Sequence, residues 1–161
     1  MRILIISDTH GKEANLGSVL VREGSFDRAF HLGDVENSGW DLQERLKCPL
    51  DIVAGNCDYP GLFPGTRIVE IGACRFFLTH GHAYHVNWGL RELRTAALRQ
   101  GCNLALYGHT HIPVVDTSDP ELTVLNPGSL TYPRQQGKRP SYLIMTLTEA
   151  GKEPSFRLKY L

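Results

Sequence analysis

The sequence has no excess of charge of either sign, because its 17 lysines and arginines balance its 17 aspartates and glutamates. Proteins that bind nucleic acids through bulk charge carry a surplus of basic residues, so we expect no binding of that kind. The balance does not exclude a nucleotide as a small phosphorylated substrate, because bound metal ions can supply positive charge locally.

Long hydrophobic runs are also missing. The apolar run near the N-terminus, Ile3 to Ile6, is too short for the core of a signal peptide or for a membrane span. The cysteines form no Cys-x-x-Cys pair, and three of the four lie in or beside apolar segments, where a reduced cysteine packs as a small hydrophobe. The four cysteines are Cys48, Cys57, Cys74 and Cys102. We therefore expect a cytoplasmic protein with no disulfides and no membrane partner.

Internal repeats, low-complexity tracts and linker-like stretches are absent as well, so we expect residues 1–161 to form a single domain. Apolar residues at helical spacing predict helices at 13–22, 39–47 and 88–100. Predicted strands cover residues 2–6, 27–32, 50–54, 66–71, 74–79, 103–107, 112–116, 122–125, 141–147 and 154–160. Gly72-Ala73 predicts a hairpin turn. This order favours an α/β fold in which two packed sheets carry helices on the outside.

Five of the predicted strands are followed at once by residues of the types that bind metal ions. These residues are Asp8 and His10, Asp34, Asn56 and Asp58, His80 and His82, and His109 and His111. In α/β sheets, ligands bind beyond the carboxyl ends of the strands, so we expect these side chains to converge. Gly33, Gly55, Gly81 and Gly108 each adjoin one of these positions and predict sharp turns beside a crowded site.

The spacing within two of these motifs carries a further prediction. Asp8 and His10, and likewise His109 and His111, are two residues apart. On an extended backbone such side chains share one side, so each pair could serve one site or two adjacent ions. By contrast, we interpret His31, inside a predicted strand, as a core histidine with its hydrogen bonds satisfied, and His85 as a loop residue near the cleft.

Taken in order, these motifs resemble those of the calcineurin-like metallophosphoesterases. The matching motifs are Asp8-x-His10, Gly33-Asp34, Gly55-Asn56-x-Asp58, His80-Gly81-His82 and Gly108-His109-x-His111. Asn126-Pro127-Gly128-Ser129, with Pro133-Arg134 after it, resembles the small YfcE-type phosphodiesterase branch. The resemblance extends from residue 2 to about residue 147. It implies a four-layer αββα sandwich of two mixed β-sheets flanked by helices.

The resemblance also implies two divalent metal ions. Asp8, His10, Asp34 and His111 would bind the first ion, and Asp34, Asn56, His80 and His109 would bind the second. Oxygen and imidazole donors suit Mn²⁺, Fe, Ni²⁺ or Zn²⁺ better than Ca²⁺; we expect Mn²⁺, with these others or Mg²⁺ as alternatives. The implied reaction is hydrolysis of a phosphate ester by a hydroxide that bridges the two ions. Resemblance to the branch favours a diester as the substrate.

Cys57 departs from the wider superfamily. Many members have a histidine directly after the metal-binding asparagine, and that histidine protonates the leaving group. Members of the YfcE-type branch also tend to carry cysteine there. A thiol with a pKa of about 8.5 is a poor substitute for an imidazolium. We therefore interpret Cys57 as a packing residue and take His82 and His10 as the candidate proton donors.

The sequence is also compatible with three alternatives to a phosphodiesterase. One is a phosphomonoesterase, and another is a structural metalloprotein without turnover. The third is a protein-interaction scaffold, because the retromer complex contains a subunit of this fold that lacks part of the ligand set. Aromatic residues at the rim could stack on a substrate or simply pack the loops: Tyr59, Phe63, Tyr84 and Trp88. Exposed edges at residues 62–71 and in the last strand could pair two copies as a homo-oligomer.

Overall fold

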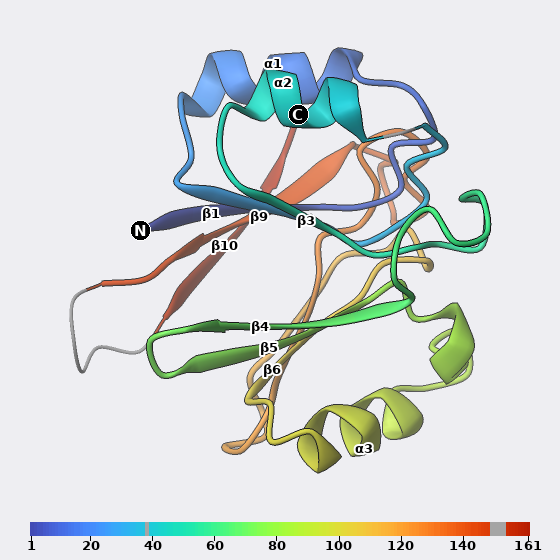
Figure 1. Ribbon diagram of the computed structural model, residues 1–161, viewed down its shortest axis with the longest axis vertical. Helices are drawn as coiled ribbons and strands as arrows, with labels where there is room; N and C mark the ends of the chain where they lie inside the picture. Colours follow the sequence, from blue (N-terminus) through green and yellow to red (C-terminus); the bar gives the residue numbers. More distant parts are fainter. Residues whose placement is uncertain (38, 149–153) are drawn as a thin grey trace.

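The computed structural model describes residues 1–37, 39–148 and 154–161, and it contains two mixed five-stranded sheets that face each other (Figure 1). The first sheet has the order β10-β9-β1-β2-β3, with β1, β2 and β3 parallel and β9 antiparallel to both β1 and β10. Its strands are β1 (Arg2–Ile6), β2 (Arg28–His31), β3 (Leu50–Ile52), β9 (Ser141–Thr146) and β10 (Ser155–Tyr160).

The second sheet has the order β4-β5-β6-β8-β7. Strands β5, β6 and β8 are parallel, whereas β4 and β7 are antiparallel to their neighbours. Its strands are β4 (Thr66–Ile71), β5 (Cys74–Thr79), β6 (Leu104–Leu106), β7 (Val114–Asp116) and β8 (Thr123–Asn126). The hairpin predicted at Gly72-Ala73 joins β4 to β5. Strands β4 and β10 lie at sheet edges, as the sequence predicted.

Helices cover the outer face of each sheet, which gives the predicted four-layer αββα arrangement. Helices α1 (Ala14–Glu23) and α2 (Trp40–Leu46) lie on the first sheet, and α3 (Arg91–Arg99) lies on the second (Figure 1). A short 3₁₀ helix, η1 (His82–Tyr84), follows β5. No helix among the described residues is long and apolar enough to cross a membrane.

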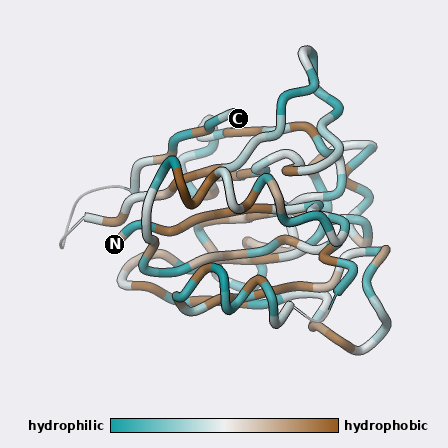
Figure 2. Tube along the Cα trace, turned by 90° about the horizontal axis from the view of Figure 1, so that it is seen from above, coloured by the Kyte–Doolittle hydropathy of each residue, from teal (hydrophilic) through white to brown (hydrophobic). Residues whose placement is uncertain are grey.

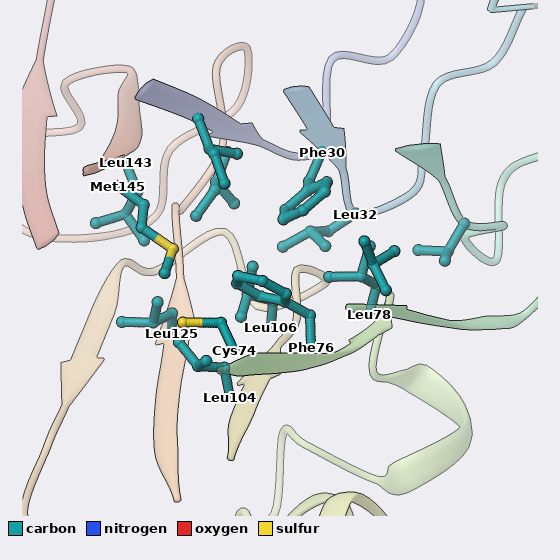
Figure 3. Close-up of a cluster of buried hydrophobic side chains, with 14 residues drawn as sticks. Phe30, Leu32, Cys74, Phe76, Leu78, Leu104, Leu106, Leu125, Leu143 and Met145 are labelled. Atoms are coloured by element: carbon teal, nitrogen blue, oxygen red, sulfur yellow. The ribbon is translucent and has the colours of Figure 1, made fainter. Parts of the chain in front are cut away.

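Three hydrophobic clusters correspond to the three interfaces between these layers. The central cluster fills the space between the two sheets, where the rings of Phe30 and Phe76 meet edge to face at a centroid distance of 5.2 Å (Figure 3). In Figure 2 long hydrophobic stretches, coloured brown, run through the middle of the molecule, and many of the outer turns are teal or white. Burial of these apolar surfaces holds the sheets together and fixes the ends of their strands relative to each other.

Two large apolar side chains of the helices are exposed. Leu98 of α3 is 40% exposed and Trp40 of α2 is 65% exposed. In each helix the buried pair is spaced by four residues, Leu93 with Ala97 and Leu42 with Leu46, and the extra apolar residue lies off that face. Helix α3 also begins three residues later than predicted, at Arg91.

Candidate metal centre

The loops that follow β1, β2, β3, β5 and β6 meet at one end of the two facing sheets. They bring together the seven side chains that the sequence singled out as metal ligands: Asp8, His10, Asp34, Asn56, His80, His109 and His111. A cleft of about 240 Å³ opens over them.

The first predicted ligand set is compact. One ligand atom from each of its four members, Asp8, His10, Asp34 and His111, lies within 4.8 Å of every other. His111 Nε2 is 3.0 Å from Asp8 Oδ1, and His10 Nε2 is 3.5 Å from His111 Nε2 and 3.9 Å from Asp34 Oδ2. These distances suit donors that surround one cation.

The second predicted set shares Asp34 with the first. His80 Nε2 lies 3.4 Å from Asp34 Oδ2, and the rings of His80 and His109 have centroids 5.1 Å apart. Asn56 lines the cleft together with Asp34 and His109. Asp34 therefore lies between the two groups of donors.

Each of three histidines is oriented by a hydrogen bond from Nδ1. His80 Nδ1 donates to the carbonyl of Leu32 at 2.7 Å, and His111 Nδ1 donates to the carbonyl of Tyr132 at 2.6 Å. His10 Nδ1 lies 2.7 Å from the Glu36 carboxylate. An acceptor at Nδ1 fixes the tautomer and leaves the lone pair of Nε2 to face the cluster, which is how ligating histidines are commonly held.

His109 is held differently. Its Nε2 lies 2.9 Å from the side-chain amide of Asn87, so Nδ1 is the ring nitrogen left for another partner.

Buried polar atoms at this site make no hydrogen bond with any described group; His111 Nε2 is 3.0 Å from Asp8 Oδ1, but the ring donates its proton from Nδ1 to Tyr132. The buried atoms are both carboxylate oxygens of Asp8 and Nε2 of His80, and both residues are fully buried. Buried polar atoms are normally hydrogen-bonded, and leaving a carboxylate without partners is costly. A cation among these donors would satisfy them, so the donor set fits a divalent metal ion.

The backbone at the ligands is left-handed, which corrects the prediction of extended pairs. Five predicted ligands have φ between 48° and 66°: Asp8, His10, Asp34, His109 and His111. This conformation costs a residue other than glycine about 1–2 kcal/mol. Strain of this kind clusters at functional sites, where the surrounding contacts hold it. The two residues of each motif come together because the strand before them ends in a strained turn. The alternation of side chains along an extended strand does not bring them together.

Gly55 leaves room for the Asp34 carboxylate. A Cβ at this position would lie less than 3.0 Å from Oδ1 and from the backbone nitrogen of Asp34. We expect Gly55→Ala to weaken metal binding about 10–100-fold, the effect usual for a displaced ligand support. Gly65→Ala is the control, since nothing lies within 4 Å of its Cβ position. Metal titration of both variants tests this, and equal affinities would contradict it.

Asp58, a motif residue without a predicted role, holds two of the ligand loops. Its carboxylate accepts hydrogen bonds from the backbone N–H groups of Asp34, Val35, Glu36 and Gly55 at 2.7–2.9 Å. These bonds join the loop after β2 to the loop after β3. The Gly-Asn-x-Asp spacing was the only sequence signal for this residue.

The Asn126-Pro127-Gly128-Ser129 motif acts in the same way on the other loops. Ser129 Oγ donates to the carbonyl of Asp8 at 2.8 Å and accepts from the backbone N–H of Tyr132 at 2.8 Å. Asn126 Nδ2 donates to the carbonyl of Gly108 at 2.9 Å. The motif thus connects the first ligand loop to the last one.

The charges in the cluster shift several pKa values. Burial raises the pKa of Asp34, but the nearby His80 and the backbone N–H of Cys57 outweigh burial and hold it well below its usual range. Burial lowers the pKa of His80, but Asp34 and Asp8 outweigh burial and raise it. Asp34 is therefore ionised at neutral pH, as a metal ligand must be.

Neither Cys57 nor His82 is arranged to donate a proton at neutral pH, because the thiol holds its proton too tightly and the imidazole is mostly unprotonated. Burial, with the Asp34 carboxylate, raises the pKa of the Cys57 thiol to about 11. Burial, with the charge of His80, lowers the pKa of His82. The Cys57 thiol lies 3.3 Å from Asn56 Nδ2 and is exposed, so it borders the cleft instead of packing in the interior.

His31 is a buried histidine with satisfied hydrogen bonds, as predicted. It is fully buried, and its Nε2 lies 2.9 Å from Thr9 Oγ1. Burial lowers its pKa from 6.5 to about 4. Below pH 6.5 the unfolded chain thus binds a proton that the folded chain does not. We expect this residue to cost about 3 kcal/mol of folding stability as the pH falls from about 6.5 to about 4. Urea unfolding of His31→Gln should show a shallower pH dependence, and an unchanged slope would contradict this.

The remaining candidates lie outside the cluster. His85 is exposed and pairs with Glu92 at 3.0 Å. Of the rim aromatics, Phe63 and Tyr84 pack against hydrophobic clusters, whereas Tyr59 and Trp88 are 74% and 92% exposed.

The chain is similar to known proteins in both sequence and fold. The sequence model of the calcineurin-like phosphoesterase superfamily domain matches residues 1–150. The probable metallophosphoesterase YsnB from Bacillus subtilis (strain 168) is 34% identical over 150 residues, which cover 91% of this chain and 85% of YsnB.

Solved structures resemble the chain over most of its length. A predicted phosphoesterase from Streptococcus pneumoniae TIGR4 has a TM-score of 0.81 at 28% identity and covers 99% of this chain and 88% of its own. The phosphoesterase YfcE from E. coli has a TM-score of 0.68 at 29% identity, with coverages of 91% and 88%. Vps29 from Cryptosporidium parvum, at 20% identity, has a TM-score of 0.77 and coverages of 99% and 97%, and it shares the fold alone.

Proposed function

Because the chain belongs to the calcineurin-like phosphoesterase superfamily, we propose that it is a phosphodiesterase that uses two divalent metal ions to hydrolyse a small phosphate ester. The observation that carries the proposal is the set of buried atoms of Asp8 and His80 without hydrogen-bond partners, which face the shared carboxylate of Asp34. Without a bound metal ion, these buried atoms would cost the folded protein free energy that nothing offsets.

The two predicted ligand sets would hold the ions, with Asp34 common to both. Asp8, His10 and His111 complete the first set, and Asn56, His80 and His109 complete the second. When bound, two divalent ions act as Lewis acids that lower the pKa of a water molecule to about 7 and offset the charge of a phosphate. Oxygen and imidazole donors favour Mn²⁺ or a similar ion over Ca²⁺. We expect this protein to work in the cytoplasm.

The protein positions these donors. It places no dedicated acid where one could protonate the leaving group. Both ring nitrogens of His10 face partners, Glu36 on one side and the first ligand set on the other. The pKa of His82 is lowered and that of Cys57 is about 11. Esters whose leaving groups need little protonation are therefore the expected substrates, which supports activated diesters.

Hydrolysis of bis(p-nitrophenyl) phosphate with and without Mn²⁺ tests the proposal, with p-nitrophenyl phosphate as the monoester for comparison. We expect Mn²⁺-dependent release of p-nitrophenol, faster from the diester. Faster release from the monoester would favour a phosphomonoesterase. Bound metal without turnover of either ester would favour a structural metalloprotein, and the absence of tight metal would favour the interaction scaffold.

A further inference from the structure

The cleft over the ligand cluster has one arginine in its lining, Arg134, among the residues that the structure describes. The ion pairs formed by the described residues do not include its guanidinium. Other arginines of the chain are paired; for example, Arg28 and Arg67 both bind Asp51, at 2.6 Å and 2.9 Å. Arg134 therefore brings an uncompensated positive charge to the cleft.

The backbone around Arg134 is fastened to a predicted metal ligand on both sides. The N–H of Arg134 donates to the carbonyl of His111 at 3.1 Å, and the carbonyl of Tyr132 accepts from His111 Nδ1 at 2.6 Å. Ser129 and Thr131 fix the preceding residues by hydrogen bonds to the carbonyls of Asp8 and Thr9. These hydrogen bonds fix the backbone of Arg134 beside the ligand cluster, so its long side chain extends from a fixed position.

We propose that Arg134 binds the phosphate of the substrate, as the positively charged donor that the chain itself supplies beside the metal ligands. The inference rests on the proposed function and adds a specificity residue to it. A guanidinium presents paired N–H donors that match two oxygens of a phosphate. A phosphodiester offers two non-bridging oxygens that such a fork can bind.

Lys12 provides a matched control. Its ammonium lies over the ring of Tyr132, 4.6 Å from the centroid, and Tyr132 lines the cleft whereas Lys12 does not. Arg134→Gln and Lys12→Gln each remove one positive charge from the same region. Arg134→Lys keeps the charge and loses the fork.

The experiment measures two properties of the Mn²⁺-loaded wild type and of the three variants. One is kcat/KM for bis(p-nitrophenyl) phosphate, and the other is the affinity for inorganic phosphate by titration calorimetry. Metal content is measured in parallel. We expect Arg134→Gln to lose about 10–100-fold in both properties, as for a lost hydrogen bond to a charged group, at unchanged metal content. Arg134→Lys should recover part of the loss, and Lys12→Gln should stay within about twofold of wild type.

Equal losses in Arg134→Gln and Lys12→Gln would overturn the proposal, because they would show a general electrostatic effect. Unchanged values in Arg134→Gln, or no phosphate binding by the loaded wild type, would also overturn it. If the wild type binds phosphate but hydrolyses no ester, the proposed function fails. The phosphate affinities of the variants would then still decide whether Arg134 binds the anion.

Discussion

Replacing Asp8 with asparagine is expected to abolish metal-dependent hydrolysis while making the metal-free protein more stable. Both carboxylate oxygens of Asp8 are buried without hydrogen bonds, so in the metal-free protein the charge has only the rings of His80 and His111 near it. Loss of residues that merely support a metal ligand costs about 10–100-fold. Loss of a ligand itself should therefore lower kcat/KM by more than about a hundredfold.

The stability gain should be about 1–3 kcal/mol, because asparagine removes the buried charge and its NH₂ group can donate to His111 Nε2, which lies 3.0 Å from the Asp8 carboxylate. It is measured by thermal unfolding of the metal-free proteins in alkaline buffer, where His111, whose Nε2 lies 3.0 Å from Asp8, carries little charge. Added Mn²⁺ should raise the Tm of Asp8→Asn less than that of the wild type, because the variant keeps only the second ligand set intact. Asp41→Asn, on the exposed side of α2, is the control for charge. A variant that keeps most of its activity would refute the role of Asp8.

Replacing Asp58 with asparagine should have the largest effect on stability. Asparagine keeps one acceptor oxygen and replaces the other with an NH₂ group. In the wild type that second oxygen accepts from N–H groups such as those of Asp34 and Gly55, which would then face another donor. Two lost hydrogen bonds to a charged group, at about 1.5–3 kcal/mol each, predict a loss of about 3–6 kcal/mol. Because these bonds hold the loops of Asp34 and Asn56, metal affinity should fall as well.

Asp51→Asn separates these two effects. Asp51 is also buried and pairs with Arg28 and Arg67, but it lies in β3, away from the ligand loops. Both variants should unfold at lower urea concentration, and only Asp58→Asn should also bind Mn²⁺ more weakly. Equal metal affinities in the two variants would show that Asp58 supports the fold without positioning the site.

Much of the fold was predictable because buried strands leave a simple signal. Apolar runs such as Ile3 to Ile6 predicted the strands, and the polar residues after them predicted the end of the sheets at which the ligand loops meet. The order of all ten strands and three helices agrees with the structure. Helix ends were less accurate: α3 starts at Arg91 because Gly89, with φ at 141°, still belongs to the preceding loop.

The finer construction of the site could not be predicted, because it depends on contacts between distant residues. Nothing local to Asp58 indicates that its carboxylate accepts four backbone hydrogen bonds, and nothing local to Ser129 indicates a bond to the carbonyl of Asp8. The left-handed backbone at His109 and His111 likewise follows from tertiary contacts that hold a strained turn. Residue types predicted the donors, whereas only the folded chain shows what holds them.

Anomalous diffraction from crystals loaded with Mn²⁺ would show whether two metal ions share Asp34. We expect two manganese peaks, one in contact with Asp8, His10, Asp34 and His111, and the other with Asp34, Asn56, His80 and His109. A single peak, peaks elsewhere in the molecule, or two peaks of which only one contacts Asp34 would contradict this expectation.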